Sequence, residues 1–220
     1  MFNINLLIIC QGLIQGVIAK SGFKSEESID KFFGITPNDY PSINIIDNSL
    51  GTYQKYRFSD VYKKMNLKNL TKFVDLWQQK KLINYKRSQP IPEYQPPIIK
   101  VVVEKNFRNV VINNDNDIVL LVFSPTDQNS KKWAELLENE VVKKLKMNEE
   151  SNPKLGFAAL DIVGNEVDDL NGKVTAVPLI MLFPGKNKNN YKIYKGEQNA
   201  ESLCDFIVDN SNNSVERDDL

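Results

Sequence analysis

Residues 118–133 read IVLLVFSPTDQNSKKW and contain a sharp change from apolar to polar side chains. The apolar run Ile118–Phe123 is uninterrupted, which is typical of a strand buried on both faces of a sheet. After the polar segment, apolar residues recur every four positions from Trp133 to Leu145. That spacing places them on one helix face and predicts a helix over 131–146. This part of the chain is therefore predicted to form a central strand, a polar turn and a long helix.

Strands and helices alternate on both sides of this segment in the C-terminal half of the chain. Short apolar runs between turn residues predict strands, and apolar residues three or four positions apart predict helices. The predicted strands are 98–103, 155–162, 179–183 and 191–194, and the predicted helices are 106–112, 167–170 and 201–208. Such an alternation, ending in a hairpin and a helix, is typical of an α/β layer fold with a mixed central sheet.

A cluster of prolines divides the chain into two predicted domains. Four prolines lie between Pro90 and Pro97, where they remove backbone donors and block both helices and central strands. We therefore interpret 81–97 as an interdomain linker. It separates a partial domain at 20–80 from a complete domain at 98–209.

The partial domain is predicted to contain two helices and two strands. Residues 67–77 have helical spacing, and 26–33 is a short helix candidate that ends before Gly34. The alternation in 42–46 predicts a strand, and 53–58 is its predicted hairpin partner.

The first nineteen residues have two interpretations. Residues 1–19 are a signal peptide if Val17-Ile18-Ala19 is a small-residue cleavage site before Lys20. Equally, Leu13–Ala19 is a buried strand that remains from a larger domain. The apolar stretch is too short and too interrupted to predict a stable membrane span.

Composition excludes several kinds of chemistry. The chain has no histidine, and its two cysteines, Cys10 and Cys204, lie far apart. These residues supply neither a histidine-based triad nor a cysteine-rich metal site, so we expect no metal and no cofactor. The formal net charge is zero, with 28 basic and 28 acidic residues, which argues against nucleic acid as a partner.

Several segments resemble the protein disulfide isomerase family. KVVVEKNF at 100–107 is similar to the start of the last catalytic domain of that family, and 118–133 resembles its strand, active site and helix. The other similar segments are AVPLIMLFPG at 176–185, YKG at 194–196, PIPEYQPP at 90–97 and FFGITPNDYPSINII at 32–46. The resemblance covers roughly residues 12–209. It implies a thioredoxin fold, preceded by a half domain from the family's substrate-binding domain.

The resemblance also implies that the catalytic cysteines are replaced. The family's Trp-Cys-Gly-His-Cys motif falls on Thr126–Ser130, so Asp127 and Ser130 stand at the two cysteine positions. The family's buried glutamate falls on Leu121. Neither Asp nor Ser can form a mixed disulfide, because the exchange requires a thiolate. We expect Asp127 to cap the following helix and Ser130 to be an exposed first-turn serine.

The same resemblance identifies candidate contacts for a peptide. Val177-Pro178 matches the family's cis-proline loop, which lies beside bound peptide, although a rigid turn without a ligand fits these residues equally well. The full set of candidates is Thr126, Gln128, Asn129, Val177 and Pro178. A half domain would also expose apolar surface, and Tyr85, Ile91 and Tyr94 are candidates to cover it. Cys204 is predicted to be a small buried hydrophobe.

Two features indicate the secretory pathway. The acidic tail at 210–220 ends in Arg-Asp-Asp-Leu, which resembles the Lys-Asp-Glu-Leu class of retrieval signals, and Asn69 and Asn212 lie in glycosylation sequons. The favoured function is a redox-inactive protein of the endoplasmic reticulum lumen that binds unfolded polypeptides or a partner protein during folding. One alternative is isomerase activity in trans through Cys204. Another is a degenerate fragment without selected activity.

Overall fold

The chain forms two compact units, Met1–Arg87 and Ser88–Leu220. The computed structural model describes residues 4–11, 13–20, 24–49, 53–146 and 152–217. The division between the units falls within 81–97. From Gln79 to Ile98 the chain forms neither a helix nor a strand.

The second unit is built on a five-stranded mixed sheet in the order β5-β7-β6-β8-β9. Its three parallel strands are β5 (Ile99–Val102), β7 (Leu155–Asp161) and β6 (Asp117–Phe123), and β8 (Leu179–Phe183) and β9 (Lys192–Ile193) continue the sheet in antiparallel pairs. With the helices between and after these strands, this is a thioredoxin-like α/β fold, as predicted from the sequence.

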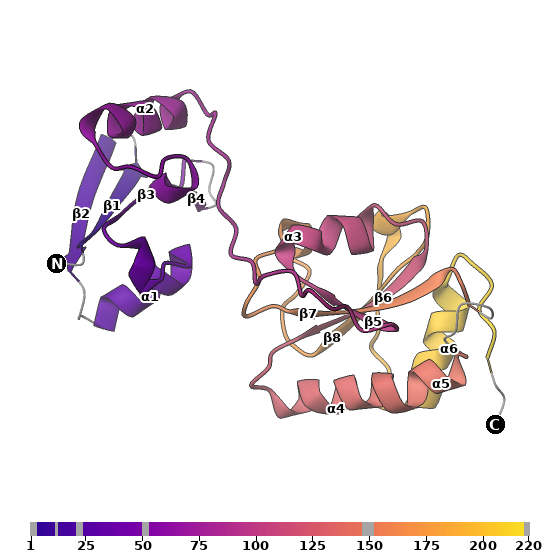
Figure 1. The fold of residues 1–220 in the computed structure, drawn as a ribbon. Helices are drawn as coiled ribbons and strands as arrows, with labels where there is room; N and C mark the ends of the chain where they lie inside the picture. Colours follow the sequence, from indigo (N-terminus) through magenta and orange to yellow (C-terminus); the bar gives the residue numbers. More distant parts are fainter. Residues whose placement is uncertain (1–3, 12, 21–23, 50–52, 147–151, 218–220) are drawn as a thin grey trace. The chain divides into compact units, whose positions relative to one another are not determined.

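Helices cover both faces of this sheet (Figure 1). One face carries α4 (Gln128–Leu136), α5 (Val142–Lys144) and α6 (Ala200–Asn210), and the other carries α3 (Glu104–Phe107) with the helical turn Arg108–Ile112. Side chains of β6 alternate between the two cores: Val119 and Leu121 contribute to the core under α4 and α6, and Leu120 and Val122 to the core under α3. An apolar run without polar interruptions is what such a doubly covered strand needs.

Helix α4 differs from the predicted helix at 131–146 in its start and its continuity. It begins at Gln128, because Asp127 supplies the cap one residue earlier. It then passes through a π-helical segment, Leu137–Val141, before α5.

The edge strand β5 is covered by a side chain from the proline-rich segment. The Gln95 amide pairs with both backbone groups of Val101, with Nε2 donating to the carbonyl at 3.1 Å and the backbone N–H donating to Oε1 at 2.9 Å. Ile91 and Tyr94 do not cover apolar surface as expected, because they remain 50% and 75% exposed. Tyr85 is half-buried, and the Arg57 guanidinium lies 4.8 Å from its ring centre.

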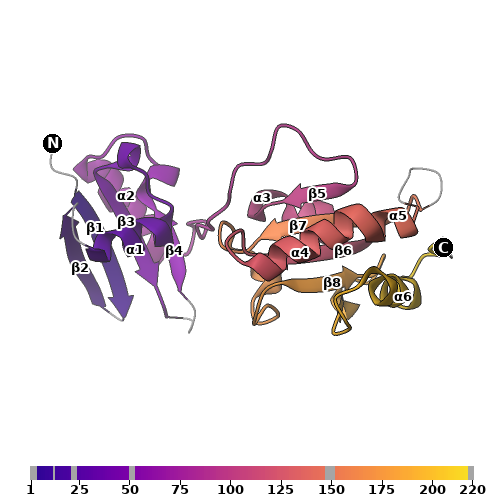
Figure 2. The ribbon, with the colours of Figure 1, turned by 90° about the horizontal axis from the view of Figure 1, so that it is seen from below.

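The first unit contains a four-stranded sheet in the order β2-β1-β3-β4 (Figure 2). The strands are β1 (Ile4–Gln11), β2 (Leu13–Lys20), β3 (Ser42–Asp47) and β4 (Gln54–Arg57), and the helices are α1 (Lys24–Phe33) and α2 (Leu67–Gln78). The sequence predicted one strand near 13–19, but the structure has a hairpin, because β1 pairs along its length with β2. The Phe33 side chain is fully buried in the core of this unit.

Candidate functional site

The turn between β6 and α4 is the first candidate site, and Asp127 lies at its centre. The Asp127 carboxylate caps α4 by accepting a hydrogen bond from the Ser130 backbone N–H at 2.6 Å. Hydrogen bonds from the side chain and backbone of Ser130 lower the pKa of the Asp127 carboxyl. Asp127 is therefore a helix cap, and its low pKa makes it a poor proton donor near neutral pH.

Ser130 is buried, which corrects the expectation that it would be an exposed serine. Only 1% of its surface is accessible, because its hydroxyl turns back and accepts a hydrogen bond from the Ser124 backbone N–H at 3.3 Å. The Ser124 hydroxyl in turn lies 3.1 Å from that of Thr126. The small side chain thus fastens the end of the strand to the first turn of the helix.

The predicted peptide contacts lie beyond the C-terminal end of the central strand β6 and the start of β8. Thr126, Gln128 and Asn129 are exposed at the start of α4, whereas Val177 and Pro178 are half-buried. The register pairs Val122 with Leu179, so the loop that precedes β8 lies beside the end of β6. The Val177-Pro178 peptide bond is cis, as predicted.

Asp161, at the end of β7, uses both carboxylate oxygens in hydrogen bonds within the protein. One of its carboxylate oxygens accepts from the backbone of Val163 and Gly164, and the other accepts from Gln89 Nε2 at 2.9 Å. These bonds fix the loop after β7 and the segment ahead of β5, which is a structural role.

The thiol of Cys204 is inaccessible. Its side chain is fully buried in the core between α6 and the sheet, and desolvation raises its pKa to about 11. Within the described ranges, acidic and thiol side chains form no cluster that could hold a metal ion. None of the helices there combines the length and apolar character that a membrane crossing requires.

A second polar centre lies at the opposite end of β6 and was not predicted. Asp117 is fully buried, and its carboxylate accepts four hydrogen bonds: from the backbone N–H groups of Gly185, Asn212 and Asn213 and from Asn213 Nδ2. The segment after α6 is thereby fixed to the base of the sheet. Asn152 extends this attachment by bonding both backbone groups of Glu216.

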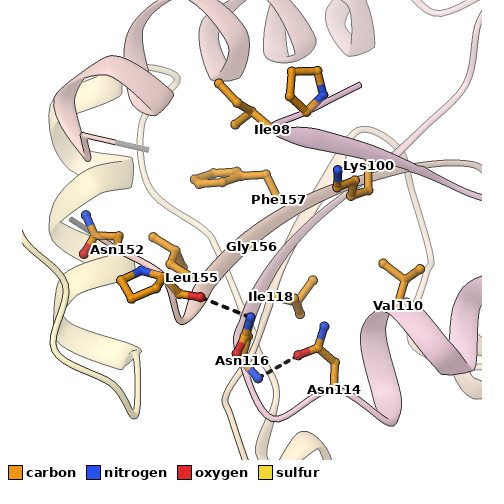
Figure 3. A pocket seen from close by; sticks show the side chains of 12 residues that line it. Ile98, Lys100, Val110, Asn114, Asn116, Ile118, Asn152, Leu155, Gly156 and Phe157 are labelled. Atoms are coloured by element: carbon orange, nitrogen blue, oxygen red, sulfur yellow. Dashed lines mark hydrogen bonds between the residues drawn. The ribbon is translucent and has the colours of Figure 1, made fainter. Parts of the chain in front are cut away.

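A pocket of about 490 Å³ opens beside this end of the sheet (Figure 3). Its apolar wall includes Ile98, Leu155 and Phe157. Two of its polar groups are bonded within the protein, since Asn116 Nδ2 donates to the Pro153 carbonyl and Lys100 Nζ donates to the Pro96 carbonyl.

Both sequon asparagines already use their side-chain nitrogens. Asn69 Nδ2 donates to the Lys64 carbonyl at 2.8 Å, and Asn212 Nδ2 donates to the Gly185 carbonyl at 2.6 Å. N-glycosylation replaces one of the two hydrogens on Nδ2, so the existing hydrogen bond would have to use the other one. Glycosylation at both positions remains a prediction.

Comparison with known proteins relates the chain to protein disulfide-isomerases. It is 26% identical over 211 residues to the mouse "Protein disulfide-isomerase-like protein of the testis", which covers 95% of this chain and 34% of that protein. It is 29% identical to the protein disulfide-isomerase of Humicola insolens, over 71% of this chain and 30% of that protein. The chain thus spans about a third of the length of these relatives. No protein-family model matches it.

Solved thioredoxin-type structures also match part of the chain. The first thioredoxin domain of mouse protein disulfide-isomerase A4 has a TM-score of 0.42 and 20% identity, covering 55% of this chain and 79% of that domain. Chloroplastic thioredoxin z has a TM-score of 0.41 and 14% identity, covering 53% of this chain and 96% of that protein. The sequence of the chain is thus similar to protein disulfide-isomerases over about a third of their length.

Proposed function

We propose that this distant relative of protein disulfide-isomerases binds unfolded polypeptides or a partner protein without catalysing disulfide exchange, in the lumen of the endoplasmic reticulum. The observation that carries the proposal is the turn between β6 and α4. Asp127 and Ser130 occupy it with oxygen-bearing side chains, where the resemblance places the two cysteines of the family. Exchange begins with attack by a thiolate, which neither residue can provide.

The position of Cys204 argues against residual thiol activity in trans. A reactive cysteine is partly exposed and has a lowered pKa. Cys204 has the opposite properties, full burial and a pKa raised to about 11. The cores on both faces of the second unit's sheet argue against a collapsed fragment.

The compartment is inferred from the relatives and from the sequence of the tail. The chain is similar to protein disulfide-isomerases, which are typically proteins of the endoplasmic reticulum. Arg217-Asp218-Asp219-Leu220 resembles a retrieval signal of that compartment. Immunofluorescence of the tagged chain, compared with a variant lacking 217–220, tests this part of the proposal.

An insulin-reduction assay tests the absence of exchange. With the full chain, we expect insulin to become turbid no faster than with dithiothreitol alone, and we expect the same result with Cys204→Ser. Activity in the full chain would contradict the proposal, and its loss in Cys204→Ser would assign it to that thiol.

Labelling with a thiol reagent at about pH 8 in Cys10→Ser gives a second measurement. A two-unit rise in pKa lowers the thiolate fraction about 100-fold, so native Cys204 should react at least that much more slowly than in urea.

Peptide binding is tested by light scattering from an aggregating client protein. We expect the full chain to suppress aggregation and Asn129→Arg to weaken the suppression, because Asn129 is exposed among the candidate peptide contacts at the start of α4. Asn139→Arg is the matched control, since it changes an exposed asparagine further along the same helical run. No suppression by excess full chain, or equal effects of the two variants, would contradict the proposed site.

A further inference from the structure

The pocket at the base of the second unit's sheet results from a stagger between two parallel strands. β7 pairs with β6 from Leu155 onward, but β5 pairs with β7 only from Ile99, which lies opposite Phe157. The first two residues of β7 therefore have no β5 residue beside them. The second of them is Gly156, and a Cβ added there would lie 2.8 Å from Ile118 Cδ1. A glycine at this position thus leaves room along the unpaired start of β7, where the pocket lies.

The lining of the pocket offers an apolar surface to a small molecule. Leu155, Phe157 and Ile118 form its buried part, and Ile98 and Val110 complete it nearer to solvent. Its volume of about 490 Å³ lies within the range typical of small-ligand sites, about 300–1,000 Å³. The pocket is therefore large enough for a ligand with an apolar body.

Lys100 supplies a positive charge to this pocket. Its side chain is half-buried, and Nζ donates one hydrogen bond, to the Pro96 carbonyl at 3.0 Å. An ammonium group has three hydrogens, so two remain for a ligand. In the part of the chain that the structure describes, no carboxylate lies within ion-pair distance of this group.

Asn114 supplies a second donor. Its Oδ1 accepts a hydrogen bond from the Asn116 backbone N–H at 2.8 Å, which fixes the orientation of the amide. Nδ2 makes no hydrogen bond to any described residue, and Figure 3 shows this nitrogen turned toward Ile118. None of the described residues that line the pocket is acidic. The unused donors therefore suit a ligand with oxygen acceptors.

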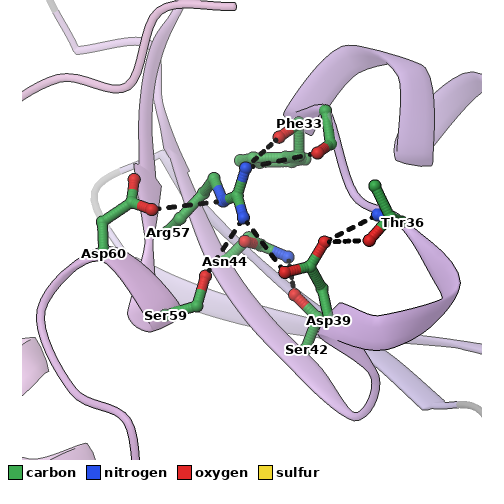
Figure 4. Close-up of polar contacts among 9 residues, drawn as sticks. Phe33, Thr36, Asp39, Ser42, Asn44, Arg57, Ser59 and Asp60 are labelled. Atoms are coloured by element: carbon green, nitrogen blue, oxygen red, sulfur yellow. Dashed lines mark hydrogen bonds and ion pairs between the residues drawn. The ribbon is translucent and has the colours of Figure 1, made fainter. Parts of the chain in front are cut away.

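Arg57 in the first unit shows the contrasting case of a basic group whose charge is already used (Figure 4). Its guanidinium lies 3.5 Å from a carboxylate oxygen of Asp39 and 3.5 Å from one of Asp60. It also donates to the Phe33 carbonyl at 3.2 Å. Lys100 has a single carbonyl partner, so its charge remains available to an anion.

We propose that this pocket binds a small organic acid with an apolar body. The body packs against Phe157 and Ile98, the carboxylate pairs with Lys100, and a second oxygen of the ligand accepts from Asn114 Nδ2. This binding goes beyond the proposed function and does not depend on it. The pocket lies at the N-terminal ends of β6 and β7, whereas the α4 site lies beyond the C-terminal end of β6.

Titration calorimetry with the full chain tests the proposal. The probe is a naphthoate with a methoxy group on the ring opposite the carboxylate. The corresponding amide keeps the shape and lacks the charge, so it should bind about fivefold more weakly. An ethyl group in place of methoxy removes the second oxygen and should also weaken binding about fivefold. Methoxyacetate, which lacks the apolar body, should show no measurable binding.

Two substitutions with matched controls assign the polar contacts. Lys100→Gln should weaken the methoxynaphthoate about fivefold and leave the amide unchanged. Lys192→Gln is its control, because Lys192 is a half-buried lysine on the edge strand β9, outside the pocket. Asn114→Asp keeps the oxygen that holds the Asn116 N–H and should abolish the preference for methoxy over ethyl. Asn113→Asp adds the same charge one residue away, outside the pocket, and should keep that preference.

Three outcomes would overturn the proposal. They are no binding of the methoxynaphthoate to the full chain, equal affinity for the acid and its amide, or equal effects of a pocket variant and its control. The last would indicate non-specific attraction to the charge of the protein. Asn129→Arg should bind the methoxynaphthoate normally, so this variant separates a failure of the pocket from a failure of the proposed α4 site. Circular dichroism checks that each variant is folded.

Discussion

The two ends of β6 carry one aspartate each and use it in opposite ways. Asp127, in the turn beyond the C-terminal end of the strand, lies near the surface and caps a helix by accepting one backbone N–H. Asp117, at the N-terminal end, is fully buried and accepts four hydrogen bonds, three of them from the segment after α6. The aspartate at the end that resembles a catalytic site is therefore held by fewer hydrogen bonds. The aspartate at the opposite end attaches the segment after α6 to the sheet.

This difference explains how a thioredoxin-like unit can keep its fold without its cysteines. Removing a group costs little where water can replace it, and much where its buried partners are left without hydrogen bonds. The α4 end depends on cap geometry that several small polar residues can provide. The Asp117 end depends on a carboxylate with all its acceptor positions in use.

Replacing Asp117 should give the largest effect. Asp117→Asn puts an amide NH₂ against N–H donors in a buried site, which should lower the free energy of unfolding by about 3 kcal/mol. Urea denaturation followed by tryptophan fluorescence measures this loss. Asp127→Asn is the matched control, and its denaturation midpoint should hardly change, because asparagine is an equally good helix cap. Similar losses in the two variants would remove the contrast between the ends.

A change in the tail should give a smaller effect. Asn213→Ala deletes one donor to Asp117, at 2.6 Å, and should lower the free energy of unfolding by about 1 kcal/mol. In the double variant with Asp117→Asn, the loss in unfolding free energy should be smaller than the sum of the two single losses, since both substitutions affect the same hydrogen-bond network. Full additivity would show that the tail and Asp117 are uncoupled.

The smallest effect is expected at Asp127, and it should depend on pH. Hydrogen bonds from Ser130 lower the pKa of this carboxyl below its ordinary value of 3.8. Its ionised form therefore stabilises the fold above that value, and the contribution disappears as the pH falls through the lower folded-state pKa. The difference in melting temperature between the wild type and Asp127→Ala should thus be present at pH 7 and shrink as the pH falls below 3.8. A difference that is independent of pH would contradict the capping role.

The sequence predicted the parts of this unit that local patterns control. The uninterrupted apolar run from Ile118 predicted β6, and the position of Asp127 ahead of the polar first turn predicted the cap of α4. It did not predict the burial of Ser130, because whether a serine hydroxyl turns inward depends on an N–H six residues away. Nor did it predict the role of Asp117, whose partner Asn213 lies 96 positions along the chain.

The first unit was harder to predict, for similar reasons. The apolar stretch before Lys20 reads as one segment, so its division into the paired strands β1 and β2 was not predicted. A cleft in this unit, lined by Tyr40 and Lys63 among others, joins segments on either side of the β3–β4 hairpin, and no local spacing brings them together. The partial-domain interpretation of this unit stays a prediction.

The Gln95 amide has a consequence for the behaviour of the molecule at high concentration. An edge strand presents unpaired N–H and C=O groups that can join the sheet of a neighbouring molecule. Gln95 occupies both groups of Val101, the third of the four residues of β5, and so acts as a one-residue substitute for an adjoining strand. A side chain in the proline-rich segment ahead of β5 thereby limits sheet-to-sheet self-association of the second unit.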